Sequence, residues 1–343
     1  QHVGAPVLAA LEPGGARDRA THRDEVPQGA PHPVEPSAPR LAGLNVADDA
    51  ARRPDDARAS DRPEAAPTSS RTLRLDLEFD GEAFSGWQRQ ADRRSVQEEV
   101  ERALARLLLV PTPVVGAGRT DAGVHARGMV ASFRTDSRIP APDIERALDG
   151  LLPRDVGVLA VREAAEGFHA RRDARWKWYR YALLRSRRRR VHERRTAWRI
   201  AEPLDVPTLL AGLEPVKGRH DFARFQKTGA PRRSTVRTIA AATLSEERGL
   251  LHLDFVGDGF LYGMVRLLVG TVVDAARRPH PDPAAASARM RALLRGADEG
   301  PRVGASAPAH GLTLMAVGVA DEEPPPFVGP SPVADLESGA AFP

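Results

Sequence analysis

The chain has 343 residues, 41% of them hydrophobic, which is enough for one large domain or two small ones with a buried core. It contains no cysteine, so disulfides, cysteine-ligated zinc and thiol nucleophiles are excluded. Its formal net charge of +4 is unevenly distributed: residues 1–70 carry −3, residues 321–343 carry −5, and residues 71–320 therefore carry +12. A basic body between acidic segments indicates an anionic partner, nucleic acid first, with a merely basic surface as the alternative.

The two ends of the chain have the composition of disordered segments. Residues 1–70 contain 10 Pro, 5 Gly and no aromatic residue, and residues 321–343 are rich in Pro and acidic side chains. Such segments bury too little apolar surface to offset the entropy of ordering. We therefore expect a disordered extension over 1–70 and a disordered acidic tail over 321–343. No apolar run is long enough to span a bilayer and no signal-peptide pattern opens the chain, which favours a cytoplasmic protein.

Hydrophobic periodicity predicts a first α+β half over residues 71–168. Alternating apolar residues indicate strands, and helical spacing indicates two helices, the first opened by a capping box of Ser95 and Glu98. In chain order the expected elements are strand 72–79, helix 95–109, strand 112–118, strand 128–135, helix 142–152 and strand 156–163. This β-α-β-β-α-β order is that of a ferredoxin-like unit.

The second half, residues 169–320, repeats this order with insertions. We expect strands 175–184 and 196–200, helix 205–213, a hairpin over 235–258 that turns at Glu247-Arg248-Gly249, helices 260–278 and 283–296, and strand 312–320. The fold class is then α+β, with two ferredoxin-like halves in one mostly antiparallel sheet and helices on one face. We expect the open face of the sheet and the seam between the halves to form a cleft.

The stretch GAGRTDAGVHARG, residues 116–128, combines four glycines with one carboxylate, Asp121, and with Arg119. It lacks the Gly-Lys-Ser/Thr of a phosphate-binding Walker loop, and no helix pattern follows it as in a dinucleotide fingerprint. Asp121 and His125 have no third ligand of clear type nearby, so a metal site is weakly supported. Two interpretations remain open: a tight turn between strands, or a loop that exposes Asp121 as a lone nucleophile or acid/base. In the second, the glycines would let a nucleotide approach the backbone.

The stretch from 171 to 199 carries 13 Arg and Lys against 2 acids, with the aromatic residues Trp176, Trp178, Tyr179 and Tyr181 interleaved. Aromatic side chains beside cations suit stacking on bases and pairing with phosphates. A strand would place Lys177, Tyr179 and Tyr181 on one face and Trp176, Trp178 and Arg180 on the other. The alternative is that the tryptophans are core residues and the arginines a solvated face.

The apolar stretch FLYGMVRLLVG contains one cation, Arg266. An arginine inside such a helix is costly unless it is paired, and Asp121 is the candidate carboxylate. The alternative is an arginine at a helix edge whose head reaches solvent.

These motifs resemble, in order and spacing, those of the TruA family of tRNA pseudouridine synthases over residues 71–320. The matching stretches are FDGEAFSGWQRQ, SVQEEVERAL, GAGRTDAGVHARGMVASF, FHAR, KWYRY, FLYGMVRLLVG and APAHGLTL. The resemblance implies that Asp121 is the catalytic aspartate and that Arg266 pairs with it. It implies that Arg119 opens the RNA and places the target nucleotide, and that Tyr179 stacks on the uracil and assists proton removal at carbon 5. Further RNA contacts are implied for the motif residues Arg89, Gln90, His125, His169, Arg171, Lys177 and Tyr181.

Members of this family isomerise uridines 38, 39 and 40 of the tRNA anticodon stem-loop. The resemblance therefore implies a tRNA partner, no cofactor, no metal, a homodimer and one tRNA lying across both subunits. Two departures stand out: Thr313 replaces an aromatic residue in GLTL, which we expect to alter one pocket wall, and FQKTGAPRRSTVRTI matches loosely in its loop. The alternative hypotheses are a non-catalytic RNA-binding protein that retains the fold, and a pseudouridine synthase that acts on another RNA.

Overall fold

The computed structural model describes residues 70–229, 234–295, 300–320 and 322–324. The two segments expected to be disordered lie outside these ranges, apart from Ser70 and residues 322–324. No helix within these ranges is both long and apolar enough to cross a bilayer.

The first half has the predicted order β-α-β-β-α-β. Its elements are β1 Arg71–Phe79, α1 Val96–Leu108, β2 Val115–Gly116, β3 His125–Thr135, α2 Ala141–Leu151 and β4 Val156–Glu163. The strands lie in the order β4-β1-β3-β2, and each neighbouring pair is antiparallel. This is a ferredoxin-like arrangement.

The second half repeats the arrangement with additions. Its strands are β5 Ala174–Arg185, β6 Trp198–Ile200, β7 Gly218–Asp221, β8 Val236–Glu247, β9 Leu250–Gly257 and β10 Leu312–Val319. Its helices are α3 Val206–Leu213, α4 Met264–Ala276 and α5 Pro283–Leu294. The strand order β10-β5-β9-β8 corresponds position by position to β4-β1-β3-β2 of the first half.

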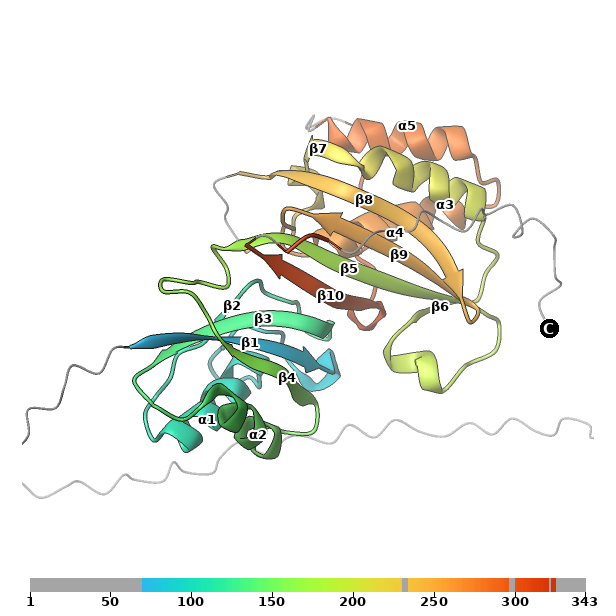
Figure 1. Cartoon of the computed structure of the whole chain (residues 1–343). Helices are drawn as coiled ribbons and strands as arrows, with labels where there is room; N and C mark the ends of the chain where they lie inside the picture. The colour runs from blue at the N-terminus through green and yellow to red at the C-terminus, as the bar shows by residue number, and fades with distance from the viewer. Residues whose placement is uncertain (1–69, 230–233, 296–299, 321, 325–343) are drawn as a thin grey trace, which may run out of the picture. The chain divides into compact units, whose positions relative to one another are not determined.

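The two halves share one ten-stranded sheet with the path β4-β1-β3-β10-β5-β9-β8-β7 (Figure 1). The seam is the parallel pairing of β10 with β3, which consists of Thr313 opposite His125 and Leu314 opposite Ala126. Parallel pairing otherwise occurs only between β5 and β6 within the described sheet, so the sheet is mostly antiparallel, as predicted.

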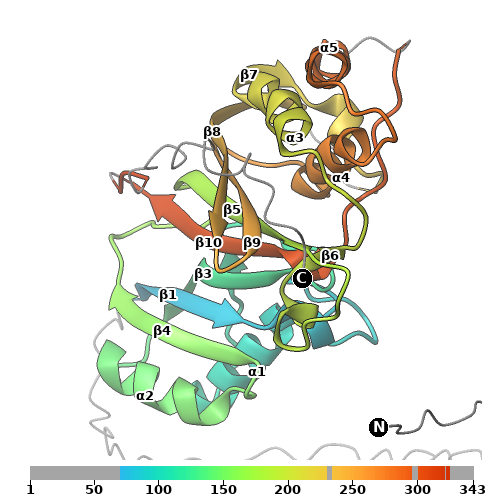
Figure 2. The ribbon, with the colours of Figure 1, turned by 90° about the vertical axis from the view of Figure 1, so that its right-hand side faces the viewer.

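Burial alternates along the strands and defines a helix-covered face. In β1, Leu73, Leu75 and Leu77 are fully buried, whereas Arg74 and Glu78 face the other side. Figure 2 shows α1 and α2 grouped beside the strands of the first half, and α3, α4 and α5 grouped beside those of the second. Buried side chains from all five helices and from one face of the strands belong to one hydrophobic core, so the helices cover one face of the sheet, as the sequence predicted.

Several predicted elements differ in length for local reasons. The strand expected over 112–118 shrinks to the two residues of β2, within a segment broken by Pro and Gly. The helix expected from Phe260 begins only at Met264, because Gly263 takes a left-handed φ of 71° that ends the preceding turn. β7 was not predicted, because its sequence GRHD has no alternating apolar residues. Ser95 is the N-cap of α1, as predicted, but its side chain makes no capping bond.

Candidate active site

Asp121 lies in a short loop, residues 118–124, that connects β2 to β3. This Asp121 loop is held by backbone hydrogen bonds to residues 84–87. The Trp87 amide donates to the Thr120 carbonyl (3.2 Å), and the Gly123 amide donates to the Phe84 carbonyl (3.2 Å). Within the loop, the Val124 amide donates to the Asp121 carbonyl (3.2 Å), which closes the turn behind the carboxylate. The carboxylate is thus carried by a rigid turn.

The loop is backed by a short 3₁₀ turn, η1 Gly81–Ala83, that follows β1. A Cβ atom added at Gly81 would lie 2.1 Å from the Val124 carbonyl oxygen, so only glycine permits this approach. The glycines of the motif itself were expected to make room for a nucleotide. Two of them also pack closely against other residues, because a Cβ at Gly116 would meet the Trp87 indole at 2.5 Å and one at Gly128 would meet the Met315 carbonyl at 2.6 Å.

Arg266 of α4 forms an ion pair with Asp121 across the seam. Its Nη1 lies 2.9 Å from Asp121 Oδ2, and the two side chains are 15% and 12% exposed. Its Nε donates to the Ala307 carbonyl at 2.8 Å, and the Ala307 amide donates back to the Arg266 carbonyl at 3.0 Å. The backbone at Ala307 therefore orients the guanidinium toward the carboxylate. The pairing that the sequence indicated is present, and the edge-arginine alternative is not what the structure shows.

Tyr179 of β5 lies on the same face and completes a compact group around Asp121. Its ring is 7% exposed and meets Phe260 edge to face, with ring centroids 5.0 Å apart. Burial, together with the negative charge of Asp121, raises the pKa of the Tyr179 phenol. The phenol therefore stays protonated at neutral pH.

Asp121 and Tyr179 line a cleft with a volume of about 1030 Å³. Its charged lining consists of five cations and two carboxylates: Arg93, Arg119, Arg171, Lys177 and Arg237, with Asp121 and Asp258. Such a lining attracts a polyanion. Arg119 is exposed, and its side chain makes no hydrogen bond or ion pair with any residue that the structure describes.

The cleft opens on the helix-covered face rather than on the open face that the sequence led us to expect. Gln97 of α1 and Met264 of α4 both line it. The reason is the alternation of β5, whose side chains Tyr179, Tyr181 and Leu183 are buried in the core. The cleft does lie at the seam between the two halves, as expected, since residues of both halves line it.

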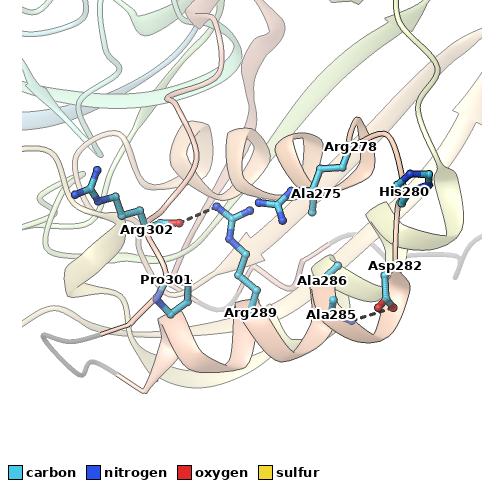
Figure 3. Close-up of a pocket in the computed structure, with 9 residues that line it drawn as sticks. All are labelled: Ala275, Arg278, His280, Asp282, Ala285, Ala286, Arg289, Pro301 and Arg302. Atoms are coloured by element: carbon cyan, nitrogen blue, oxygen red, sulfur yellow. Dashed lines mark hydrogen bonds between the residues drawn. The ribbon is translucent and has the colours of Figure 1, made fainter.

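A second cavity, of about 530 Å³, lies at the ends of α4 and α5 (Figure 3). Its lining includes four basic residues, Arg278, His280, Arg289 and Arg302. Arg289 is already bound to Asp274 (2.8 Å) and to the Arg302 carbonyl (2.8 Å). None of the residues that line this cavity also lines the cleft around Asp121, so we place the candidate site in the larger cleft.

Three of the expected RNA contacts line the cleft. They are Gln90, Arg171 and Lys177. Gln90 also donates from Nε2 to the Ser85 carbonyl at 3.0 Å. Arg89 does not line the cleft; it is exposed nearby and forms an ion pair with Glu101 at 3.3 Å.

The structure places three other expected contacts away from the cleft. Tyr181 is fully buried and donates its hydroxyl hydrogen to the Pro308 carbonyl at 2.8 Å. His125 is buried, its Nδ1 accepting from the Gly81 amide (3.1 Å) and its Nε2 donating to the Arg195 carbonyl (2.8 Å). His169 Nδ1 accepts from the Arg172 amide at 3.2 Å. These contacts secure the fold around the site rather than reach into it.

Thr313 does not form a wall of the cleft, contrary to expectation. It lies opposite Arg180 in β5, whereas its neighbours Leu312 and Leu314 lie opposite Tyr181 and Tyr179. Because side chains alternate along a strand, Thr313 points to the opposite face of the sheet, and Leu312 lines the cleft instead.

Two residues near the site were not among those predicted. Tyr262, which lies just before α4 and is 41% exposed, lines the cleft, and Lys227 lies with its Nζ 6.0 Å from the Tyr262 ring centroid. Burial, and the nearby charge of Arg266, lower the pKa of Lys227. The scarcity of lysine could have pointed to Lys227. The chain has 47 Arg and only 3 Lys, and two of these, Lys177 and Lys227, lie at the site.

No group of three or more His, Asp or Glu in the described parts of the chain is placed to hold a metal ion. The group that the structure assembles is one carboxylate paired with one arginine, beside a buried tyrosine in a basic cleft. This arrangement suits covalent or acid/base chemistry on an anionic substrate.

A family model described as tRNA pseudouridine synthase matches residues 77–171 and 215–318. Curated relatives include the tRNA pseudouridine synthase A of Citrifermentans bemidjiense, 42% identical over 250 residues that cover 72% of this chain and 97% of the relative. Those of Geobacter sp. strain M21 (42% identical, 72% and 98% covered) and Moorella thermoacetica (41% identical, 71% and 98% covered) are similar to the same extent. Among solved structures, a chain of a Cbf5-Nop10-Gar1 complex aligns with a TM-score of 0.28 and 10% identity over 72% of this chain and 60% of that one.

Proposed function

This chain belongs to the TruA family of tRNA pseudouridine synthases and is an isomerase that acts on tRNA; we propose that its targets are uridines 38, 39 and 40 of the anticodon stem-loop and that Asp121 is its one catalytic carboxylate. The observation that supports this most is the ion pair of Asp121 and Arg266, 2.9 Å long and set in the basic cleft at the seam.

The chemistry of pseudouridine formation explains why a single carboxylate is enough. The bond from carbon 1′ of ribose to N1 of uracil breaks, a bond from carbon 1′ to carbon 5 forms, hydrogen leaves carbon 5, and N1 gains one. Product and substrate have the same composition, so no second carboxylate is needed to activate water. Asp121 can attack the sugar or the base, or remove a sugar proton, and Arg266 favours the ionised carboxylate that each route requires.

Tyr179 is suited to hold the detached base by stacking. Its ring is fixed by Phe260 and faces the same cleft as Asp121. The raised pKa of its phenol disfavours the phenolate, which weighs against proton removal from carbon 5 by that form. We therefore assign Tyr179 the stacking role first.

Arg119 is suited to open the RNA at the target. A uridine in the stem is paired and stacked, so extruding it costs a few kcal/mol. Arg119 is exposed at the mouth of the cleft, two residues from Asp121, and has no partner among the described residues. It can therefore contact the phosphate backbone or fill the space that the extruded base leaves.

Residues 71–168 and 169–320 are proposed to act as the two halves of one catalytic domain. Asp121 comes from the first half, and Tyr179 and Arg266 come from the second, so neither half carries the whole group. On the family resemblance we further propose a cytoplasmic homodimer with one tRNA lying across both subunits.

The decisive experiment measures release of hydrogen from carbon 5 of labelled uridine in tRNA and maps pseudouridine in the product. We expect the chain without substitutions to convert the uridines at positions 38, 39 and 40 to pseudouridine. Asp121→Asn is expected to lower kcat by at least about 10³-fold while binding tRNA with unchanged affinity.

A tRNA in which positions 38–40 carry no uridine serves as the control, and it should release no hydrogen. Release from that tRNA would favour another target, and full activity of Asp121→Asn would remove the role assigned to the carboxylate. Binding without any release, even by the unmodified chain, would favour a non-catalytic RNA-binding protein.

A further inference from the structure

The loop between β5 and β6, residues 186–196, is strongly basic and is not part of the cleft lining. We refer to it as the basic loop. Arg187, Arg188 and Arg189 are exposed, and their side chains make no hydrogen bond or ion pair with the described residues. The only acidic residue of the loop, Glu193, is already paired with Arg190. Three neighbouring arginines are therefore left for a partner outside the chain.

Two sets of hydrogen bonds to other parts of the protein hold the basic loop in a defined conformation. At its start, Arg199 Nη1 donates to the Arg187 carbonyl at 3.2 Å and to the Ser186 carbonyl at 3.4 Å. Arg190 Nη1 donates to the Arg248 carbonyl at 3.4 Å, which ties the loop to the β8–β9 turn. The free arginines are thereby presented by a defined backbone.

The end of the basic loop is joined to the scaffold of the Asp121 loop. Arg195 forms an ion pair with Glu82 of η1, and its carbonyl accepts the Nε2 hydrogen of His125 at 2.8 Å. On its other side, His125 Nδ1 accepts from the Gly81 amide, and Gly81 packs against the Val124 carbonyl. His125 and Gly81 therefore connect the basic loop to residues 118–124.

We propose that the basic loop is a second docking surface for the phosphate backbone of the substrate tRNA, outside the nucleotide held in the cleft. This inference rests on tRNA being the substrate. A cleft of about 1030 Å³ holds only a small part of a tRNA, so most of the molecule lies over the outer surface of the protein. Exposed arginines bind phosphates through planar, bidentate donors, and each phosphate neutralised releases counterions.

The test compares tRNA affinity at several salt concentrations, using Asp121→Asn so that bound tRNA is not converted. Replacing Arg187, Arg188 and Arg189 together by Gln is expected to weaken tRNA binding about 10-fold or more at low salt. The slope of log K against log salt concentration should become shallower by about 2 to 3, since each phosphate contact contributes about 0.9. In the chain with Asp121 intact, the triple substitution should raise KM and leave kcat unchanged.

Two control variants separate docking from overall charge. Replacing Arg106, Arg291 and Arg295 by Gln removes the same charge from exposed positions on α1, on α5 and directly after α5, and should change the slope much less. Replacing Arg187, Arg188 and Arg189 by Lys keeps the charge and should retain most of the affinity. The proposal is overturned if the basic-loop Gln variant binds as the parent does, or if both Gln variants lose affinity equally. Because binding is measured without turnover, these outcomes are independent of which uridine is modified and of the role of Asp121.

Discussion

At the scale of single residues, the site depends on where Arg266 obtains its orientation. Its Nε donates to the Ala307 carbonyl, which holds the side chain in the conformation that places Nη1 beside Asp121 Oδ2. Lysine can supply a charge at this position but has no planar pair of donors. Arg266 is therefore expected to position the carboxylate as well as to balance its charge.

Arg266→Met should lower kcat by about 10² to 10³-fold and leave KM for tRNA nearly unchanged, because the lost donor acts on the reacting carboxylate. It should also lower the free energy of unfolding by about 3 kcal/mol, since a largely buried carboxylate is left unpaired. Single-turnover kinetics and urea denaturation measure the two effects.

Arg266→Lys is the matched control and should restore stability more than kcat. If Arg266→Met retained the parent kcat, the ion pair would be a structural feature only. If KM rose as steeply as kcat fell, Arg266 would be acting on tRNA binding instead.

At the scale of elements, the Asp121 loop takes its shape from η1, a turn of three residues. Gly81 touches the Val124 carbonyl and also donates to His125, so one small residue supports both the loop and the start of β3. The shape of the Asp121 loop is thus set by backbone contacts behind it rather than by side chains in the cleft.

Gly81→Ala should lower kcat by about 10-fold or more and destabilise the fold by about 1 to 3 kcal/mol, because the new Cβ would lie 2.1 Å from the Val124 oxygen and force the loop to move. The measurements are pseudouridine formation and thermal unfolding. Binding of tRNA should be affected less than turnover.

Gly150→Ala is its control, because no atom lies within 4 Å of the Cβ position and the residue lies within α2. That substitution should stabilise the protein by up to about 1 kcal/mol and leave kcat unchanged. Equal kinetics for the two alanine variants would show that the loop tolerates movement.

The elements also show how much of this structure can be predicted from the sequence. The hairpin was predicted correctly from Glu247-Arg248-Gly249, because Arg248 and Gly249 take φ values of 53° and 75° at the turn that local composition signals. Whether Tyr181 reaches the cleft or the core depends on residues 308–311, distant in sequence, which pack on its ring. Strand alternation placed Tyr179 correctly beside Lys177 on one face, but could not say which face the cleft would use. Local chemistry was therefore predictable, and long-range packing was not.

At the scale of the whole molecule, the sheet carries a buried titrating group on the face away from the cleft. His252 of β9 is 9% exposed, and its Nδ1 is buried without a hydrogen-bond partner among the described residues. Burial, and the charge of Arg180, lower the pKa of His252, while the neighbouring carboxylates Asp254 and Glu247 oppose the shift. The folded protein therefore favours the neutral ring.

We expect the free energy of unfolding to fall as the pH is lowered from 7 to 5, with less than about 1 kcal/mol coming from His252. Below a pH of about 6.5 the unfolded chain binds a proton that the folded chain resists, so unfolding takes up protons and acid favours it. His252→Leu should flatten this dependence, as followed by urea denaturation at each pH.

Measurements at pH 8 provide the internal reference, because the His252 ring is neutral there in both the folded and the unfolded state. A difference in unfolding free energy between variant and parent at pH 8 therefore reports a change in packing, and it can be subtracted before the pH dependences are compared. A slope between pH 7 and 5 that is identical for the variant and the parent would assign the pH dependence to other groups.

The position of β10 has a consequence for when the enzyme becomes active during its synthesis. This strand is the last described strand in the chain, yet it lies in the middle of the sheet, between β3 and β5. The ribosome releases the first half and most of the second before it releases the strand that joins them, and just upstream of that strand lies Ala307, which orients Arg266. A nascent chain that ends before Leu312 can form strands of each half but not the seam on which the ion pair depends. We therefore expect activity to appear only when translation of residues 71–320 is nearly complete.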